Sequence, residues 1–309
     1  RCGTRLPGFP VSAHHPETES MNLAVKGFIK ALRSELLIAR HTLGAWLVVL
    51  LPSVFISLQF LVVKMSETGA AARDSLLGQG GFDAIIANNA YGHFVDGLSM
   101  GLTLLGLLLV AQAAYSFSVD RDSGALRHLL IRCSSRRAVV LAKLLQLHLL
   151  ALLAILLLIA TSYLVSDSLW DFGPVVEDGF ELIGEEEIAS EIKLGLELAL
   201  LPLPAAIAFG VLVSVVANSA TQAVVSALGL SLVLDVFKGM LGEYAYYLYA
   251  TFQPSLLDQS YLQDVGRLVR GYSDVLVDER FLELNQWVPL PALLILVVAS
   301  LFVVQKRKV

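Results

Sequence analysis

The sequence predicts an all-α membrane protein with six transmembrane helices. Of its 309 residues, 56% are hydrophobic and 16% are charged, whereas a typical soluble domain is about 45–50% apolar and about 25% charged. A helix needs about 20 mainly apolar residues to cross the hydrocarbon core of a bilayer. Six stretches meet this requirement: residues 43–63, 97–118, 139–164, 195–217, 220–239 and 288–304. No internal repeat or low-complexity linker divides residues 21–309, so we expect a single transmembrane domain there.

The N-terminal part of the chain differs from the spans. Residues 1–20 are rich in proline and polar residues and contain no apolar core of signal-peptide length. We expect them to be a disordered leader or an extension in front of Met21. Residues 21–40 place apolar side chains at helical spacing against polar ones, which predicts an amphipathic helix lying in the headgroup plane of the bilayer; the alternative is the solvated start of the first span. Its charged positions include Lys26, Lys30, Arg33 and Glu35.

Two prolines, Pro202 and Pro204, lie near the start of the fourth predicted span. Proline removes a backbone N–H and is tolerated inside a transmembrane helix where neighbouring groups bond the freed carbonyl. We therefore expect a kink at these residues.

The distribution of lysine and arginine predicts the orientation in the membrane, because cytoplasmic connections collect these residues. The segment before the first span, the connection between the second and third spans, and the C-terminal tail are basic. The connection at 167–193 instead holds nine carboxylates and one cation, Lys193. We therefore expect both termini to be cytoplasmic and the chain to lie in the cell's inner membrane. The basic residues are Lys26, Lys30, Arg33 and Arg40, then Arg121, Arg127, Arg132, Arg136, Arg137 and Lys143, and finally Lys306, Arg307 and Lys308.

Three connections are then predicted to lie outside the cell. Residues 65–96 are expected to form a loop of small and polar residues that includes glycine-rich 78–81. Residues 167–193 are expected to be a solvated acidic loop. Residues 240–287 begin with a tyrosine-rich run that suits a membrane interface, and their part at 256–281 predicts one or two amphipathic helices on or in the outer leaflet.

No catalytic constellation is found in the sequence. The phosphate loop, the His-Glu-x-x-His motif, the nucleophile elbow and the paired-cysteine motif are all missing. The two cysteines, Cys2 and Cys133, are too few for a disulfide framework and are interpreted as free thiols. We expect this chain to be no enzyme and to bind neither a cofactor nor a metal itself.

Polar residues within the spans are functional candidates, because burying them in hydrocarbon is costly. His148 lies two to three turns into the third span, where we expect a hydrogen bond to another helix or, alternatively, a proton relay. Asp235 and Lys238 lie toward the outer end of the fifth span at i, i+3 spacing. They are expected to form an ion pair near the interface; a role in the transport pathway or in gating is the alternative.

The basic connection at 116–143 carries the most specific pattern in the chain. It contains Asp120-Arg121-Asp122-Ser123-Gly124-Ala125-Leu126, then Leu129-Leu130, then Ser135-Arg136-Arg137 and Lys143. This pattern predicts a turn in which Gly124 adopts a left-handed conformation. A short helix would follow, with Leu126, Leu129 and Leu130 on one face. Such a helix is suited to dock in the groove of a partner protein.

Together with six spans and the Arg33-Ser34-Glu35 element of the N-terminal helix, this pattern resembles the permease subunit of a bacterial ABC-2-type ABC transporter. The resemblance extends over residues 21–309, and its specific part covers 120–143. The chain has Asp122 in place of the usual glutamate, Ala125 in place of a threonine and Cys133 in place of a proline.

The resemblance implies a coupling helix at 124–131 that receives motion from a separate ATP-binding subunit. It implies two such subunits, which would bind ATP and Mg²⁺, and a second permease subunit, with a homodimer expected. Partners would include the lipid bilayer but no nucleic acid. The residues implied in contact with the ATP-binding subunit are Asp120, Arg121, Asp122, Gly124, Leu126, Arg127, Leu129, Leu130 and Arg136. For the arginines, binding of lipid phosphates remains an alternative.

Three functions are therefore compared. The first is a subunit of an ATP-driven transporter, with export implied by the resemblance and an amphiphilic cargo favoured by the apolar spans. The second is an ion-coupled secondary transporter that uses His148, Asp235 and Lys238; inverted repeats would be expected there, and none is found. The third is a membrane anchor or assembly protein that transports nothing.

Overall fold

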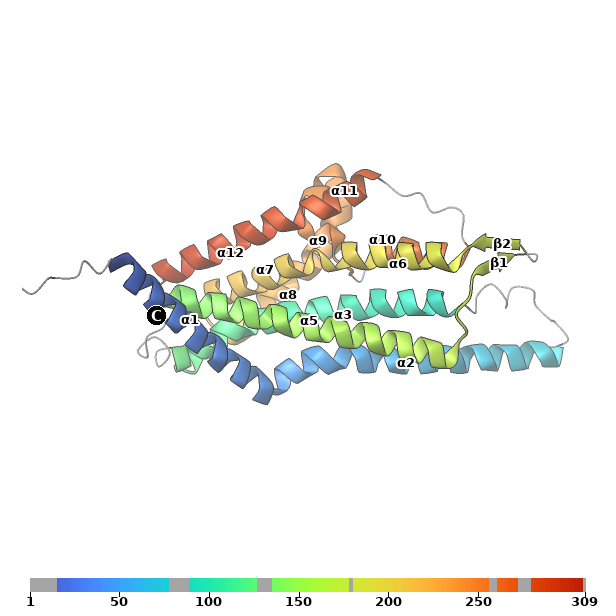
Figure 1. Ribbon diagram of the computed structural model, residues 1–309, viewed down its shortest axis with the longest axis horizontal. Helices are drawn as coiled ribbons and strands as arrows, with labels where there is room; N and C mark the ends of the chain where they lie inside the picture. The colour runs from blue at the N-terminus through green and yellow to red at the C-terminus, as the bar shows by residue number, and fades with distance from the viewer. Residues whose placement is uncertain are drawn as a thin grey trace, which may run out of the picture.

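Long helices packed lengthwise make up the protein (Figure 1). The computed structural model describes residues 16–77, 89–126, 135–177, 180–255, 260–271 and 279–307. The first half contains α1 (Pro16–His41), α2 (Leu43–Leu77), α3 (Ala90–Asp122), α5 (Arg136–Leu169), β1 (Val175–Glu177) and β2 (Phe180–Ile183). The second half contains α6 (Glu185–Leu200), α7 (Leu203–Val216), α8 (Ala220–Phe237), η3 (Lys238–Tyr247), α9 (Tyr249–Phe252), α10 (Tyr261–Leu268), α11 (Glu279–Trp287) and α12 (Pro289–Lys306).

The six predicted spans are confirmed. In the part of the chain that the structure describes, six helical segments are long and apolar enough to cross a membrane. They are Leu43–Leu76, Ala90–Asp122, Arg136–Leu169, Glu185–Val216, Ala220–Tyr247 and Glu279–Lys306. The protein is therefore an all-α, multi-pass membrane protein.

Two predicted outer loops are wrong in extent, because the helices continue beyond their apolar cores. The expected loop at 65–96 is helical up to Leu77 and again from Ala90; the alanine-rich run at 70–72 favours helix even without an apolar face. The acidic connection at 167–193 contains the antiparallel β1–β2 hairpin and the first turns of α6. Glu185, Glu186 and Glu187 lie in the first turn of α6, where carboxylates interact favourably with the helix dipole.

The N-terminal helix begins earlier than predicted. It starts at Pro16, so the last five residues of the expected disordered leader are helical; residues 1–15 lie outside the described ranges. Helix α1 ends at His41 and α2 starts at Leu43, with a sharp elbow between them (Figure 1). Of the segment at 256–281, α10 is a predicted helix, and α11 overlaps the segment only at residues 279–281 before it continues toward α12. Residues 256–259 and 272–278 are not described.

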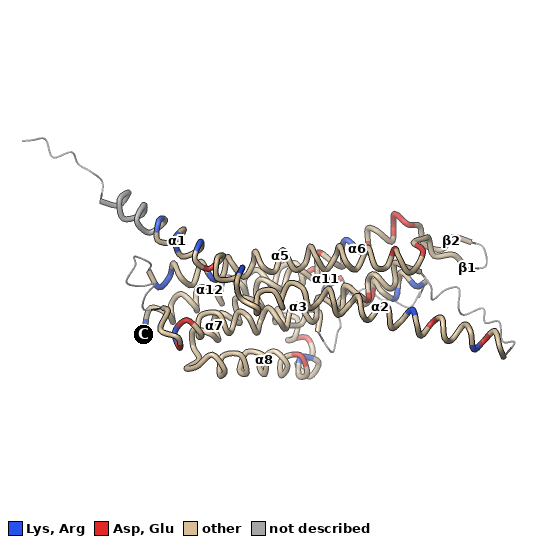
Figure 2. The backbone as a smooth tube through the Cα atoms, turned by 90° about the horizontal axis from the view of Figure 1, so that it is seen from below, with Lys and Arg blue, Asp and Glu red and all other residues tan. Residues whose placement is uncertain are grey.

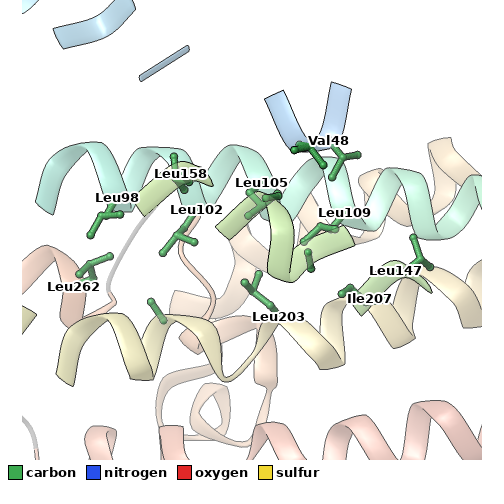
Figure 3. Close-up of a cluster of buried hydrophobic side chains, with 14 of the residues drawn as sticks. Val48, Leu98, Leu102, Leu105, Leu109, Leu147, Leu158, Leu203, Ile207 and Leu262 are labelled. Carbon is green, nitrogen blue, oxygen red and sulfur yellow. The ribbon is translucent and has the colours of Figure 1, made fainter. Parts of the chain in front are cut away.

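Helix α3 lies at the centre of the core, since it packs against α2, α5, α7, α8 and α10. Leu98, Leu102, Leu105 and Leu109 of α3 are fully buried and meet Leu158 of α5 and Leu203 of α7, as well as residues of α2 and α10 (Figure 3). On the α7 side, Gly210 allows a close approach: a Cβ there would lie 2.7 Å from the Cβ of Ala113 and 2.8 Å from the carbonyl oxygen of Val110. Close helix contacts through small residues are typical of membrane bundles.

The predicted kink at the two prolines is confirmed as a break between α6, which ends at Leu200, and α7, which starts at Leu203. Because Pro202 has no N–H, the carbonyl of Leu198 lacks its usual partner four residues later. The side chain of Asn285 in α11 donates a hydrogen bond to this carbonyl at 3.2 Å. Asn285 is only 1% exposed, so α11 supplies the bond that the proline removes.

Replacing Asn285 with leucine is expected to lower the free energy of unfolding by about 1–2 kcal/mol, because the Leu198 carbonyl would be buried without a partner. Leu201 and Pro202 have helical backbone angles, so a Pro202→Ala chain can restore the N–H. In the Pro202→Ala background, Asn285→Leu should lower the free energy of unfolding by clearly less, because the restored N–H can bond the Leu198 carbonyl. Titration with a denaturing detergent measures both costs, and equal costs in the two backgrounds would contradict this account.

Candidate functional site

Basic residues gather at one end of the bundle (Figure 2). At this end lie α1, the end of α3, the start of α5, the end of α7, the start of α8 and the end of α12. We call this the basic end. The opposite end holds the β1–β2 hairpin and the acidic start of α6 (Figures 1 and 2). The middle of the bundle carries few charges, as expected of a hydrocarbon-spanning region.

A buried triad of charges joins three helices at the basic end. The Nζ of Lys143 in α5 lies 2.9 Å from Oε2 of Glu35 in α1 and 2.6 Å from Oδ2 of Asp120 in α3. The side chains of Lys143, Glu35 and Asp120 are only 3%, 6% and 15% exposed. We call these residues the Lys143 triad. It is the only buried contact in the described part that ties charged groups of α1, α3 and α5 together.

The triad holds two carboxylates against one ammonium in a region from which water is largely excluded. Burial raises the pKa of Glu35, and the neighbouring Asp120 carboxylate raises it further, while the Lys143 ammonium opposes both. Oε1 of Glu35 is buried and has no hydrogen-bond partner among the described residues. Glu35 therefore depends on Lys143 for its charged form, and the contact is sensitive to any movement of α1 relative to α5.

Asp122 connects the end of α3 to the start of α8. Its Oδ2 accepts a hydrogen bond from the backbone N–H of Ala220 at 2.7 Å, next to the N-cap Ser219. A carboxylate at this position satisfies a free N–H and interacts favourably with the helix dipole. The acidic residue of the sequence pattern thus holds two transmembrane helices together.

Arg136 and Arg307 bond the C-terminal carbonyls of neighbouring helices. Arg136 at the start of α5 donates to the carbonyls of Val304 and Arg307 at the end of α12. Arg307 in turn donates to the carbonyls of Val215 and Ala217 and, at 2.5 Å, to Oδ1 of Asn218, all at the end of α7. Cations favour these positions because the last carbonyls of a helix lack partners.

Arg121 adds a further charge to this network. Its Nη2 lies 3.5 Å from Oδ1 of Asp122, and its side chain is 15% exposed. Burial and the nearby Arg121 guanidinium lower the pKa of Arg307. The helix termini at the basic end are therefore connected by hydrogen bonds and ion pairs. A movement of α3 would change the contacts of α7, α8 and α12.

The turn after α3 has the predicted conformation, since Gly124 has φ +75°. Leu126, expected on the exposed face of a docking helix, is instead 1% exposed and belongs to the core. Arg127, Leu129 and Leu130 lie outside the described residues. On α1, the side chains of Lys26, Lys30 and Arg33 are exposed as an amphipathic helix requires, but Glu35 is buried.

The predicted ion pair between Asp235 and Lys238 is confirmed, with 2.8 Å between Oδ1 and Nζ. Ser255 completes it: its hydroxyl donates to Asp235 at 2.6 Å and accepts from Lys238 at 2.9 Å. The pair is deeper than predicted, because Asp235 lines a cavity together with Thr103, a residue in the middle of α3. Helix α8 also ends well short of the hairpin end of the bundle (Figure 2).

His148 does not join this pair. Its Nδ1 lies 2.6 Å from the carbonyl oxygen of Leu144 in its own helix, and the expected hydrogen bond to another helix is not found among the described residues. His148 is also not among the residues that line the cavity beside Asp235. The described residues thus do not bring together the three groups that an ion-coupled mechanism would use.

Two cavities run along α3 and share Thr103 and Ser255. One has a volume of about 40 Å³ and is lined by Asp235 and Gln253; the other has about 290 Å³. We call them together the polar cleft. Its other polar residues are Gln59, Asp96, Ser99, Ser231 and Gln263.

Sequence reasoning missed a cluster at the opposite end. The Nε2 of His93 lies 3.2 Å from Oε1 of Glu67, while the indole N–H of Trp170 donates to Oε2 of the same carboxylate at 2.8 Å. The rings of His93 and Trp170 stack with centroids 3.9 Å apart. The cluster fixes the extended part of α2 against α3 and α5. It was missed because Glu67 was assigned to a loop.

The fold and these contacts define a class: a helical membrane domain whose helix termini are tied together at a basic end and whose interior holds a polar cleft. The family model described as ABC-2 family transporter protein matches residues 21–304, which is nearly the whole chain, and the protein therefore belongs to the ABC-2 transporter family. It is thus an ABC transporter permease, and membership of this family implies an ATP-binding partner protein. No curated protein matches the chain.

Proposed function

We propose that this chain is the transmembrane subunit of an ATP-driven exporter and that a separate subunit hydrolyses the ATP. The observation that carries the proposal is the Lys143 triad. It joins the N-terminal helix, the end of α3 that leads into the 124–131 segment, and the start of α5. A force applied to the segment after α3 would therefore reach two further helices through buried ionic contacts rather than through a flexible loop.

The position of the charges supports a cytoplasmic basic end. The end of α3, the start of α5 and the end of α12 lie at the same end of the bundle (Figure 1). These elements carry Arg121, Arg136, Lys143 and Lys306, and cytoplasmic connections collect such residues. In this orientation both termini are in the cytoplasm and the segment at 124–131 faces the ATP-binding subunit.

The polar cleft supports a transport pathway. Its polar side chains lie in an otherwise apolar membrane region, where such groups mark substrate routes. The span Ala220–Tyr247, which contains α8 at the edge of the cleft, is the least buried of the six spans. We propose that a second copy of the permease covers this side, so that two copies and two ATP-binding subunits form the transporter. The apolar residues along the cleft, Met100, Leu107 and Leu262 among them, favour an amphiphilic cargo.

Co-purification tests the coupling role. The permease is expressed together with ATP-binding proteins encoded by neighbouring genes, and the captured complex is assayed for ATPase activity. Replacing residues 127–130 with a Gly-Ser linker, which keeps the buried Leu126, is expected to abolish capture. The matched control replaces residues 175–183 of the hairpin at the opposite end and should leave capture unchanged. Capture that survives the first replacement, or is lost equally in both, would contradict the proposal.

A further inference from the structure

A cavity of about 370 Å³ opens at the elbow between α1 and α2, where both helices face α5. Its walls are mostly apolar, with Leu149 and Leu153 of α5 opposite Val49 of α2. The volume lies in the usual range for sites that bind small ligands, about 300–1,000 Å³. The cavity is separate from the polar cleft and shares none of its lining residues.

A nearly buried amide lines this cavity. Gln146 of α5 is 6% exposed, and no hydrogen bond joins it to any of the residues that the structure describes. Buried polar side chains are rarely left without a partner. An amide in an otherwise apolar wall therefore indicates a ligand that brings a polar group to this depth and apolar atoms around it.

Arg40 and Trp46 mark the mouth of the cavity. The indole N–H of Trp46 donates to the backbone carbonyl of Arg40 at 3.0 Å, which holds the ring at the elbow. The Arg40 side chain is exposed and forms no ion pair within the described ranges. Lys30 and Arg33 precede it on the same exposed side of α1, so the mouth lies at the end of a basic stripe that attracts anionic headgroups.

We propose that the elbow cavity binds one anionic phospholipid, with its phosphate on Arg40, an ester carbonyl on the Gln146 amide and an acyl chain along the leucines of α5. Tryptophan at the mouth suits the same depth, because indole rings prefer the boundary between headgroups and hydrocarbon. Lipid binding at this cavity depends neither on the ATP-binding partner nor on the proposed orientation in the membrane. It goes beyond the proposed function.

The bound lipid would lie one helical turn from the Lys143 triad. Leu36 at the cavity follows Glu35 in α1, and Gln146 follows Lys143 by three residues in α5. A ligand between these helices would hold α1 against α5 at the point where the triad joins them. The lipid composition would then set how firmly the N-terminal helix is attached.

Trp46 itself reports binding. The full chain is reconstituted in vesicles whose two leaflets are identical, with brominated phosphatidylglycerol or brominated phosphatidylcholine added to unbrominated phosphatidylcholine. The fluorescence quenching of Trp46 is obtained by subtracting the quenching of a Trp46→Phe chain from that of the wild type. The subtraction removes the contributions of Trp170 and Trp287. We expect phosphatidylglycerol to associate about fivefold more strongly than phosphatidylcholine, since one basic side chain near a surface contributes about this factor.

Arg40→Gln should remove the preference for phosphatidylglycerol. Arg33→Gln is the matched control: it deletes one positive charge from the same basic stripe of α1 but outside the cavity, and it should keep most of the preference. Ala39→Phe fills the cavity from α1 without changing any charge and should abolish saturable quenching. Equal association of the two lipids with the wild type would overturn the proposal. So would equal losses in Arg40→Gln and Arg33→Gln, which indicate general surface charge, or saturable quenching that survives Ala39→Phe.

Discussion

Replacing Lys143 with methionine is expected to lower the free energy of unfolding by about 3–5 kcal/mol, because two carboxylates would stay buried without a cation. Methionine keeps the length of the side chain, so the effect reports the charge. Burial and Asp120 both raise the pKa of Glu35 and only Lys143 opposes them, so Glu35 should take up a proton in this variant. Titration with a denaturing detergent measures the loss.

Two comparisons show whether the loss comes from the buried charges. Lys193→Met removes a lysine whose side chain is 78% exposed and 3.9 Å from Glu197, and such exposed pairs contribute little. The triple variant Lys143→Met, Glu35→Gln, Asp120→Asn leaves no charge at the site of the triad and should regain most of the stability, yet it should not couple ATP hydrolysis to transport. A Lys143→Met chain no less stable than Lys193→Met would refute the triad as a structural element.

Lys238→Met is expected to have the second largest effect, again about 3–5 kcal/mol, because the Asp235 carboxyl group, which is 9% exposed in the middle of the bundle, would lose its cation. The double variant Asp235→Asn, Lys238→Met should recover most of this loss. Ser255→Ala, which removes the hydroxyl that bonds both members of the pair, should cost less, about 1–3 kcal/mol. Thermal unfolding in detergent gives the order of the three variants.

The same variants separate a structural role of the pair from a role in the pathway. If the pair only fixes the segment after α9 to the end of α8, the double variant should transport as well as the wild type. We expect it to be stable but defective, because Asp235 lines the polar cleft beside Thr103. Full transport by the double variant would show that the pair is structural only.

Much of the fold follows from the sequence, because crossing a bilayer imposes a length of apolar helix that is visible in the residue order. The six spans, the helix before them, the break at Pro202 and Pro204 and the left-handed Gly124 were all predicted and are confirmed. The predictions were wrong at the ends of the helices. Hydropathy marks where hydrocarbon begins, but helices such as α2 continue into water on local propensity and tertiary contacts alone.

The candidate site was predicted only in part. The resemblance implied contacts with an ATP-binding subunit for Asp120, Asp122 and Arg136, and Glu35 was expected only as part of the amphipathic helix. The structure pairs each of these residues inside the chain. The contacts of Glu35, Asp122 and Arg136 join residues about 100 or more positions apart, and the contact of Asp120 joins two different helices. No spacing rule could relate them.

The amino-acid sequence by itself determined how many times the chain crosses the membrane and at which end its positive charges collect, since both depend on the composition of short stretches. Only the tertiary structure decided that Lys143 lies between Glu35 and Asp120, that Asn285 bonds the carbonyl freed by Pro202, and that an amide faces the elbow cavity. Each of these depends on how helices distant in the chain are rotated against one another. That rotation is set by the packing of the whole bundle around α3 and not by any local pattern of residues.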